Sequence, residues 1–245
     1  MPRLLALIPH PDDESYSFSG TITLAARAGW ECFIYCASSG ERGKRHDGGP
    51  TTPAAVAAQR ESELAASCAA LGCNPPTFLR RPDGQLRKTS YGRNFIAGIF
   101  SEMAPDLVLC LGPDGAYGHP DHIAVYKWVV RAWHKGHRAF PLVFPVFPQG
   151  LFLPQYEKVI RMLGDPPNPP REVIGSDTWH YEVPIAAVKE AKLASIGAHK
   201  SQLPGGDPEA IFPPGIVREL LAVERFEDAT GRFHQSTAEL LASLG

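Results

Sequence analysis

A short run that is apolar throughout, at residues 3–8, constrains the fold of this chain more than any other feature. It reads RLLALI, and prolines at positions 9 and 11 close it. A strand with apolar residues at successive positions buries both of its faces, which is typical of a parallel sheet covered by helices on both sides. The run therefore predicts the first strand of such a sheet.

Comparable apolar runs recur along the chain and alternate with segments of helical periodicity. This alternation predicts an α/β fold: a Rossmann-like, doubly wound, mostly parallel sheet with helices on both faces, in a single domain over residues 1–245. We expect further strands at 31–37, 77–79, 106–112 and 179–183, and helices at 15–29, 54–72, 91–103, from about 119 onward and after 184.

Some elements are less well defined by their residues. In the helix at 91–103, Phe95, Ile99 and Met103 form the expected buried stripe. Residues 141–154 are apolar and interrupted by prolines, so 142–144 and 146–147 read as sheet with broken pairing. Residues 219–226 are apolar enough for a short element of undecided type, and the segments 164–176 and 203–215 read as loops.

The composition excludes several classes of protein. A net charge of −2 implies no general attraction to nucleic acid or to membrane surfaces. No apolar stretch is long enough to span a bilayer, and the first strand is not followed by a signal-peptide cleavage site. The five cysteines contain no CxxC pair, so we expect reduced core cysteines of a cytoplasmic protein. The oligomeric state stays open, and a homo-oligomer is compatible with the sequence.

The first strand leads directly into a polar cluster, PHPDDE at residues 9–14. Open α/β sheets bind ligands beyond the carboxyl ends of their strands, so His10 and the acids after it lie where such folds perform chemistry. Side chains of adjacent residues diverge, and Asp12 and Asp13 must therefore point in different directions. One of these carboxylates can bind a metal ion while the other faces water beside it.

A second polar cluster, YGHPDH at residues 117–122, follows another predicted strand. It opens a helix in which His122 lies on the inward side, with His119 one turn earlier. His10, Asp13 and His122 would together supply two imidazoles and one carboxylate, the composition of an open catalytic metal site. These donors suit Zn²⁺, and also Fe²⁺ or another divalent ion.

With both clusters present, the sequence resembles the PIG-L/LmbE family of zinc-dependent de-N-acetylases. Further stretches fit the family at moderate specificity: SGE at 39–41, RxxE at 60–63, PDG at 82–84 and AHKSQ at 198–202. The resemblance covers roughly residues 3 to 202, and the two histidine clusters are its specific part. Pro9 is a departure, since alanine is commoner there in the family.

The resemblance implies a zinc-dependent hydrolase that removes the acetyl group from an N-acetylated sugar. The typical substrate is N-acetylglucosamine or a conjugate of it, so the expected partner is a small-molecule glycoside or glycoconjugate. Asp12 would act as the general base toward the attacking water. His119, if protonated, would stabilise the oxyanion, and either residue could protonate the leaving amine.

Three residues are candidates for substrate binding, each with a competing structural explanation. Arg60 lies on the inward stripe of its predicted helix, where it either pairs with a neighbouring acid or, as the resemblance implies, contacts a substrate hydroxyl. Asp83 lies in a Pro-Asp-Gly sequence, which by itself indicates only a turn. Its position after a strand and the family pattern favour a role in substrate binding. Tyr117 could bind the oxyanion or cap the pocket. The competing explanation is that it is an aromatic residue of a loop with no role in the site. Asp121 is placed to orient one of the histidines.

Two other functions would use some of the same features. Two histidines and a carboxylate also form the facial triad of non-haem iron oxygenases, but an oxygenase needs no base such as Asp12 beside the metal. A non-catalytic nucleotide- or sugar-binding module would also fit the alternation of strands and helices. However, no Gly-rich phosphate turn follows the first strand, so no phosphate cradle is present.

Overall fold

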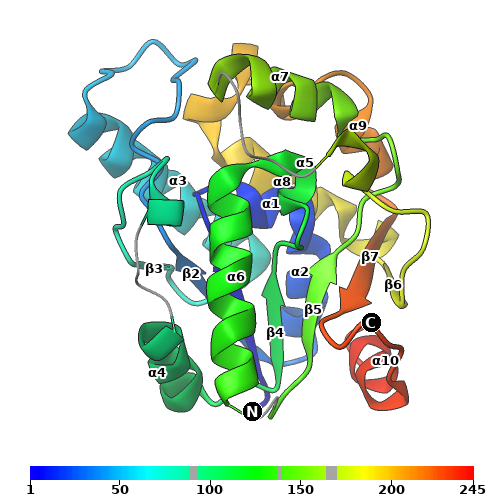
Figure 1. The fold of residues 1–245 in the computed structure, drawn as a ribbon. Helices are drawn as coiled ribbons and strands as arrows, with labels where there is room; N and C mark the ends of the chain where they lie inside the picture. Colours follow the sequence, from blue (N-terminus) through cyan, green and yellow to red (C-terminus); the bar gives the residue numbers. More distant parts are fainter. Residues whose placement is uncertain (89–92, 137–138, 164–169) are drawn as a thin grey trace.

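The computed structural model describes residues 1–88, 93–136, 139–163 and 170–245. Within these ranges, a seven-stranded sheet with the order β3-β2-β1-β4-β5-β7-β6 forms the centre of the molecule (Figure 1). β1 to β5 run parallel, and β7 is antiparallel to both of its neighbours. The predicted mostly parallel α/β fold is therefore confirmed. The strands are β1 Arg3–Ile8, β2 Glu31–Cys36, β3 Thr77–Phe78, β4 Leu107–Cys110, β5 Leu142–Pro145, β6 Tyr181–Pro184 and β7 Val223–Asp228.

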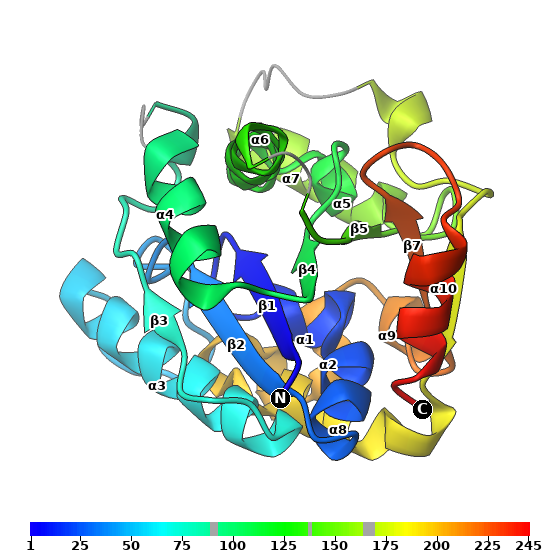
Figure 2. The ribbon, with the colours of Figure 1, turned by 90° about the horizontal axis from the view of Figure 1, so that it is seen from below.

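Helices cover both faces of this sheet. Figure 2 shows α4 and α6 on one side of β1, β2 and β4, with α2, α3 and α8 on the other. The short helices α1 and α5 lie at the tips of strands, and α7 lies beyond them (Figure 1). The helices are α1 Asp13–Ser17, α2 Ser19–Arg27, α3 Pro53–Leu71, α4 Arg93–Met103, α5 Gly115–Gly118, α6 Pro120–Lys135, α7 Leu153–Leu163, α8 Lys189–Ala198, α9 Ile216–Glu219 and α10 Gln235–Ala242.

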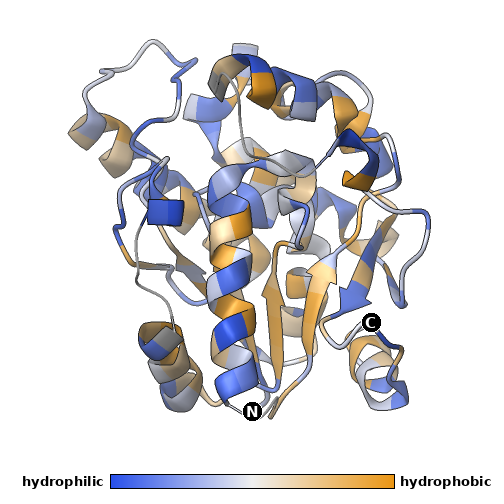
Figure 3. Cartoon of the chain, in the orientation of Figure 1, coloured by the Kyte–Doolittle hydropathy of each residue, from blue (hydrophilic) through white to orange (hydrophobic). Residues whose placement is uncertain are grey.

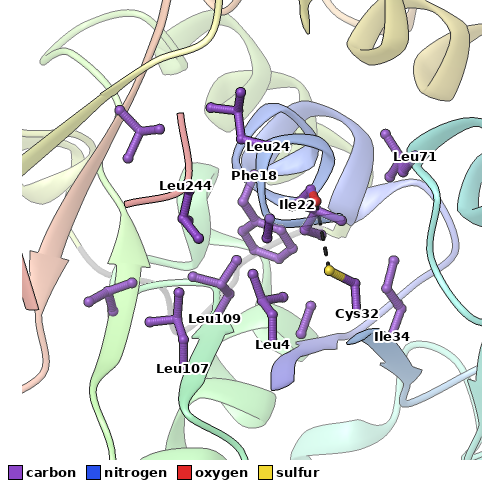
Figure 4. Packing of buried hydrophobic residues seen from close by; sticks show 14 of the residues in the cluster. Leu4, Phe18, Ile22, Leu24, Cys32, Ile34, Leu71, Leu107, Leu109 and Leu244 are labelled. Atoms are coloured by element: carbon purple, nitrogen blue, oxygen red, sulfur yellow. Dashed lines mark hydrogen bonds between the residues drawn. The ribbon is translucent and has the colours of Figure 1, made fainter. Parts of the chain in front are cut away.

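The uniform hydrophobicity of β1 follows from burial on both faces. Its Leu4 packs in one core with Phe18, which lies between α1 and α2, and with Ile22 of α2 (Figure 4). Leu5 packs in the opposite core beneath α4 and α6. Figure 3 shows the same apolar character along β4 and β5, while α6 carries both hydrophilic and hydrophobic residues. Successive strand side chains point to opposite faces, so a strand between two helical layers must be apolar at every position.

Two predicted helices differ from the structure. The helix predicted at 15–29 is divided into α1 and α2 at Phe18, whose φ of −154° and ψ of 20° are not helical, and α1 already begins at Asp13. The predicted stripe of α4 was wrong at Phe95, which is exposed. The buried residues are Ile96, Ile99 and Phe100, the i, i+3, i+4 pattern of a helix that covers one face of a sheet. Residues 91–92 of that prediction lie outside the described residues.

The second half of the chain departs further from the prediction. β5 ends at Pro145, so residues 146–147 are not sheet, and the undecided segment 219–226 contains the end of α9 and the start of β7. Helices α7 and α10 were not predicted, and residues 164–169 of the predicted loop lie outside the described residues. A third buried cluster lies beyond the strand tips; its aromatic members, here called the aromatic cluster, are Tyr16, Tyr117, Phe147, Phe152, Tyr156 and Phe212.

None of the helices in the described ranges combines the length and the apolar character needed to cross a membrane.

Candidate active site

The two polar clusters meet at the carboxyl ends of β1 and β4, which are neighbours in the sheet. After β1 the chain continues to β2 on one side, and after β4 it continues to β5 on the other, so the topological switch point of the sheet lies here. α1 begins shortly after β1, and α5 and α6 follow β4. The fold thus brings together side chains from distant parts of the chain.

Asp13 lies between His10 and His122. Its Oδ2 is 3.3 Å from His10 Nδ1, and its Oδ1 is 3.3 Å from His122 Nε2. All three residues are buried. The two contacts use different oxygens of Asp13, one for each imidazole. Among the described residues, the sets that offer one ligand atom each within 4.8 Å of one another are His10, His119 and His122, and His10, Asp83 and Asp121. The structure therefore brings the three predicted metal ligands together.

The imidazole of His122 is oriented as a ligand would be. Its Nδ1 lies 3.1 Å from the carbonyl oxygen of Gly115, and since a carbonyl only accepts, Nδ1 carries the proton. The lone pair on Nε2 is buried and makes no hydrogen bond within the described part of the chain. Burial, opposed by the charge of Asp13, lowers the pKa of His122 to about 4, so the ring is neutral at pH 7. A buried lone pair beside a carboxylate fits a divalent cation.

The other edge of His10 faces two further carboxylates. Its Nε2 lies 3.2 Å from Asp83 Oδ1 and 3.5 Å from Asp121 Oδ2. Burial alone would lower the pKa of His10, but hydrogen bonds to Asp121, Asp13 and Asp83 raise it well above its ordinary value. Carboxylates behind a ligand histidine orient the ring and increase its basicity. The structure thus places Asp83, a predicted substrate-binding residue, directly against His10.

Asp121 is held in place by the backbone of the neighbouring loop. Its Oδ2 accepts from Gly84 N at 2.7 Å, and its Oδ1 accepts from Leu86 N at 3.0 Å. These two bonds connect the start of α6 to the segment after β3. The carboxylate is therefore fixed beside His10 of the first cluster, whereas the sequence suggests that it orients one of the histidines next to it in the second cluster.

His119 belongs to the same cluster of histidines. Ring nitrogens of His10, His119 and His122 lie within 4.8 Å of one another. His119 is also the N-cap residue of α6, and its Nδ1 accepts from Asp121 N at 3.3 Å. Burial and the two neighbouring histidines lower the pKa of His119 well below its ordinary value. The neutral ring therefore carries its proton on Nε2 and can donate a hydrogen bond. The protonated form, on which the added positive charge would depend, is disfavoured.

Asp12 and Arg60 form an ion pair at the edge of this cluster. Arg60 Nη2 lies 3.0 Å from Asp12 Oδ2, and the guanidinium also donates to the carbonyl oxygens of Gly40 and Pro11. Burial raises the pKa of Asp12 to about 6, and the positive charge of Arg60 opposes the rise. Of the two explanations for Arg60, the structure shows the ion pair with a neighbouring acid.

Tyrosines close the apolar side of the site. Tyr117 is buried in the aromatic cluster, with its ring centroid 5.1 Å from that of His122. Tyr16, for which the sequence predicts no role, donates its hydroxyl to Asp13 Oδ1 at 2.8 Å. Tyr16 follows Asp13 by three residues, and i, i+3 neighbours meet on a helix, so this spacing was the available signal.

Comparisons with known proteins show what the chain is similar to. The family model described as PIG-L, GlcNAc-PI de-N-acetylase, matches residues 5–133. A protein of Nakamurella multipartita, named 1D-myo-inositol 2-acetamido-2-deoxy-alpha-D-glucopyranoside deacetylase, is 30% identical over 241 residues. That alignment covers 83% of this chain and 81% of the relative.

Solved structures share the fold at lower identity. The N,N'-diacetylchitobiose deacetylase from Pyrococcus horikoshii superimposes with a TM-score of 0.64 at 23% identity, covering 94% of this chain and 84% of that one. The 4-carboxy-2-hydroxymuconate hydratase from Pseudomonas putida KT2440 gives a TM-score of 0.65 at 19% identity, covering 96% and 99%. One fold therefore carries different reactions, and the side chains of the site must decide the function.

Proposed function

The chain belongs to the PIG-L family of de-N-acetylases, and we propose on this basis that it is a metal-dependent hydrolase acting on an N-acetylglucosamine-type substrate. The observation that supports the proposal most directly is the buried lone pair of His122 Nε2, 3.3 Å from Asp13. The carboxylate of Asp12, the residue before Asp13, pairs instead with Arg60. This separates a metal-binding carboxylate from a carboxylate that can move a proton.

We assign the metal to His10, Asp13 and His122. Zn²⁺ is the ion we propose, with Fe²⁺ or another divalent ion as the alternative, because two imidazoles and a carboxylate suit them all. When bound, the ion supplies Lewis acidity, which makes a water molecule more acidic and polarises an amide carbonyl.

Asp12 is the proposed general base. With a pKa raised to about 6 by burial, it is ionised at neutral pH and can accept the proton of the attacking water. The Nε2–H of His119 is the proposed donor to the oxyanion that develops on the acetyl carbonyl. Asp12, which has then taken a proton from water, is the proposed donor to the leaving amine. Protonation by His119, the alternative expected from the sequence, would require its imidazolium form, which burial and the two neighbouring histidines disfavour.

For the substrate we propose a small N-acetylated glycoside or glycoconjugate. One similar protein is named for a myo-inositol glycoside and another for N,N'-diacetylchitobiose, so both serve as probes. Arg60, Asp83 and Tyr117 stay the proposed substrate contacts. Membership of a hydrolase family argues against the oxygenase and against the non-catalytic binding module.

The proposal is tested by amine release from purified protein loaded with Zn²⁺ or Fe²⁺. The probes are N-acetylglucosamine, N,N'-diacetylchitobiose and N-acetylglucosaminyl-inositol, and the Asp12→Asn variant with matched metal content is the control. We expect amine from at least one probe with the wild-type chain and far less with the variant. Folded, metal-loaded protein that releases no amine from any N-acetylglucosaminide would overturn the proposal.

We also propose a cytoplasmic location. All five cysteines of the sequence are free, although several are buried close to one another in the core, as expected in a reducing compartment. Fractionation of cells that produce the protein checks the location. The single domain over residues 1–245 also stays a prediction, and one cooperative unfolding transition would support it.

A further inference from the structure

Glu14 is a buried carboxylate that the proposed chemistry does not use. It follows Asp13 in the chain and is 0% exposed, so it touches neither solvent nor substrate. One of its oxygens, Oε2, accepts from the backbone nitrogen of Asp12 at 3.2 Å. Glu14 is thus bonded to the backbone of the proposed general base.

Two side chains from other elements hold Glu14 in turn. Ser67 in α3 donates its hydroxyl to Glu14 Oε1 at 2.6 Å, and His199, just after α8, places its Nε2 2.7 Å from the same oxygen. His199 is also 0% exposed, and its Nδ1 makes no hydrogen bond within the residues that the structure describes. A carboxylate removed from water needs such partners, because its charge is otherwise uncompensated.

The backbone that this arrangement holds is strained. Asp12 has φ 126° and ψ −20°, a region that residues with a side chain rarely adopt. In this conformation the chain turns so that Asp13 faces His10 and His122 while Asp12 faces Arg60. Strained backbone of this kind persists only where its surroundings hold it.

We propose that Glu14 and His199 form a positioning pair that holds Asp12 in this conformation and thereby sets the direction of its carboxylate. The inference rests on the proposed function, since it gives the pair a role through the general base. Neither residue is a catalytic residue, because each acts only through Asp12. The pair explains why a histidine far along the chain, within the AHKSQ stretch, lies buried beneath the first polar cluster.

The central variant is His199→Leu, which removes the donor to Glu14 and keeps an apolar side chain of moderate size. A displaced catalytic group can cost about 10²-fold in rate, so we expect kcat to fall by about 10- to 100-fold with KM within about twofold. His199→Gln keeps an N–H donor and should recover most of the loss. His180→Leu is the control, since His180 bonds Asp228 N at the β6–β7 edge of the sheet, and kcat should be unchanged.

A double-variant cycle separates positioning from general damage. In an Asp12→Asn background, His199→Leu should lower kcat no further, because the residue through which the pair acts is already disabled. An equal loss in both backgrounds, loss of metal, or a rise in KM with unchanged kcat would each overturn the proposal. If His199→Leu does not fold, Ser67→Ala removes another donor to Glu14 and takes its place in the cycle.

A readout that needs no substrate distinguishes failure of this proposal from failure of the proposed function. Hydrogen exchange of the Asp12 amide, measured by NMR, should be faster in His199→Leu than in the wild type and in His180→Leu. Unchanged exchange in a folded variant would overturn the positioning pair. Absence of amine release by the wild type would instead overturn the proposed function.

Discussion

The Nζ atom of Lys192 lies 2.5 Å from Oε1 of Glu224, and both side chains are buried. Glu224 also accepts from the backbone nitrogens of Gly20 and Thr21 at the first turn of α2, and Lys192 donates to Tyr16 O. This ion pair therefore connects β7, near the end of the chain, to the helices that follow the first polar cluster.

Lys192→Met should strongly destabilise the protein. It leaves Glu224 buried without its cation, and breaking a buried pair in this way costs about 3–5 kcal/mol. The free energy of unfolding is measured with urea. Arg80→Met is the matched control, because Arg80 pairs with Glu61 at an exposed position and should contribute at most about 1 kcal/mol. Equal effects of the two substitutions would contradict the prediction.

His122→Ala should remove most of the bound metal. Metal-free wild-type protein should also release about one proton per ion on binding at pH 7, because a ligand histidine must be neutral. Burial lowers the pKa of His10, but its carboxylate neighbours raise it well above its ordinary value, so His10 is the expected source of the proton. Calorimetry in buffers of different ionisation enthalpy measures the release. Full metal content in His122→Ala would show that the ligands are assigned wrongly.

Asp12→Asn should keep the metal and lose most turnover. Loss of a general base costs about 10² to 10⁴ in rate. In the metal-free wild type, burial and the opposing charge of Arg60 place the pKa of Asp12 at about 6, so NMR of the carboxyl carbon should show a transition near that pH. The base is active when ionised, and a divalent cation beside it favours that form, so the pH at which the metal-loaded protein becomes active should lie at or below this value. If Asp12→Asn loses metal as severely as Asp13→Asn, the roles of the two carboxylates are reversed.

His119 carries two separable roles, helix capping and hydrogen-bond donation. His119→Ala removes both, whereas His119→Asn keeps a good N-cap for α6 but lacks the imidazole Nε2–H. We expect both variants to lower kcat far more than they raise KM, because the donor acts on charge that develops during the reaction. Only His119→Ala should also lose stability, by about 1 kcal/mol. A raised KM with unchanged kcat would mean that His119 only binds the substrate.

Tyr16→Phe should weaken metal binding without abolishing it. The hydroxyl of Tyr16 donates to Asp13 Oδ1, and removal of a partner that orients a ligand typically costs about 10- to 100-fold in metal affinity. Competition with a chromophoric chelator measures this affinity. Tyr35→Phe is the control, since its hydroxyl faces Met103 on another part of the molecule. Identical affinities of the two variants would exclude an orienting role for Tyr16.

The parallel part of the fold was predictable because its signals are local. Each of the first four strands is marked by its own apolar residues, and each polar cluster follows directly on a strand. That His10, Asp13 and His122 meet could be expected as well, since the ends of parallel strands share one edge of a sheet. The sequence alone thus determined the class of fold, the edge that carries the polar clusters and the residue types gathered there.

Only the tertiary structure decided which partner each polar group has. His199 meets Glu14 across 185 positions, and Lys192 in α8 meets Glu224 in β7 across 32. Hydrophobic periodicity reports which face of an element is buried, but a hydrogen bond depends on which elements pack together and at what distance. For the same reason the sequence left Arg60 with two explanations, and only the structure showed the ion pair with Asp12 Oδ2, while the contact with substrate stays a proposal.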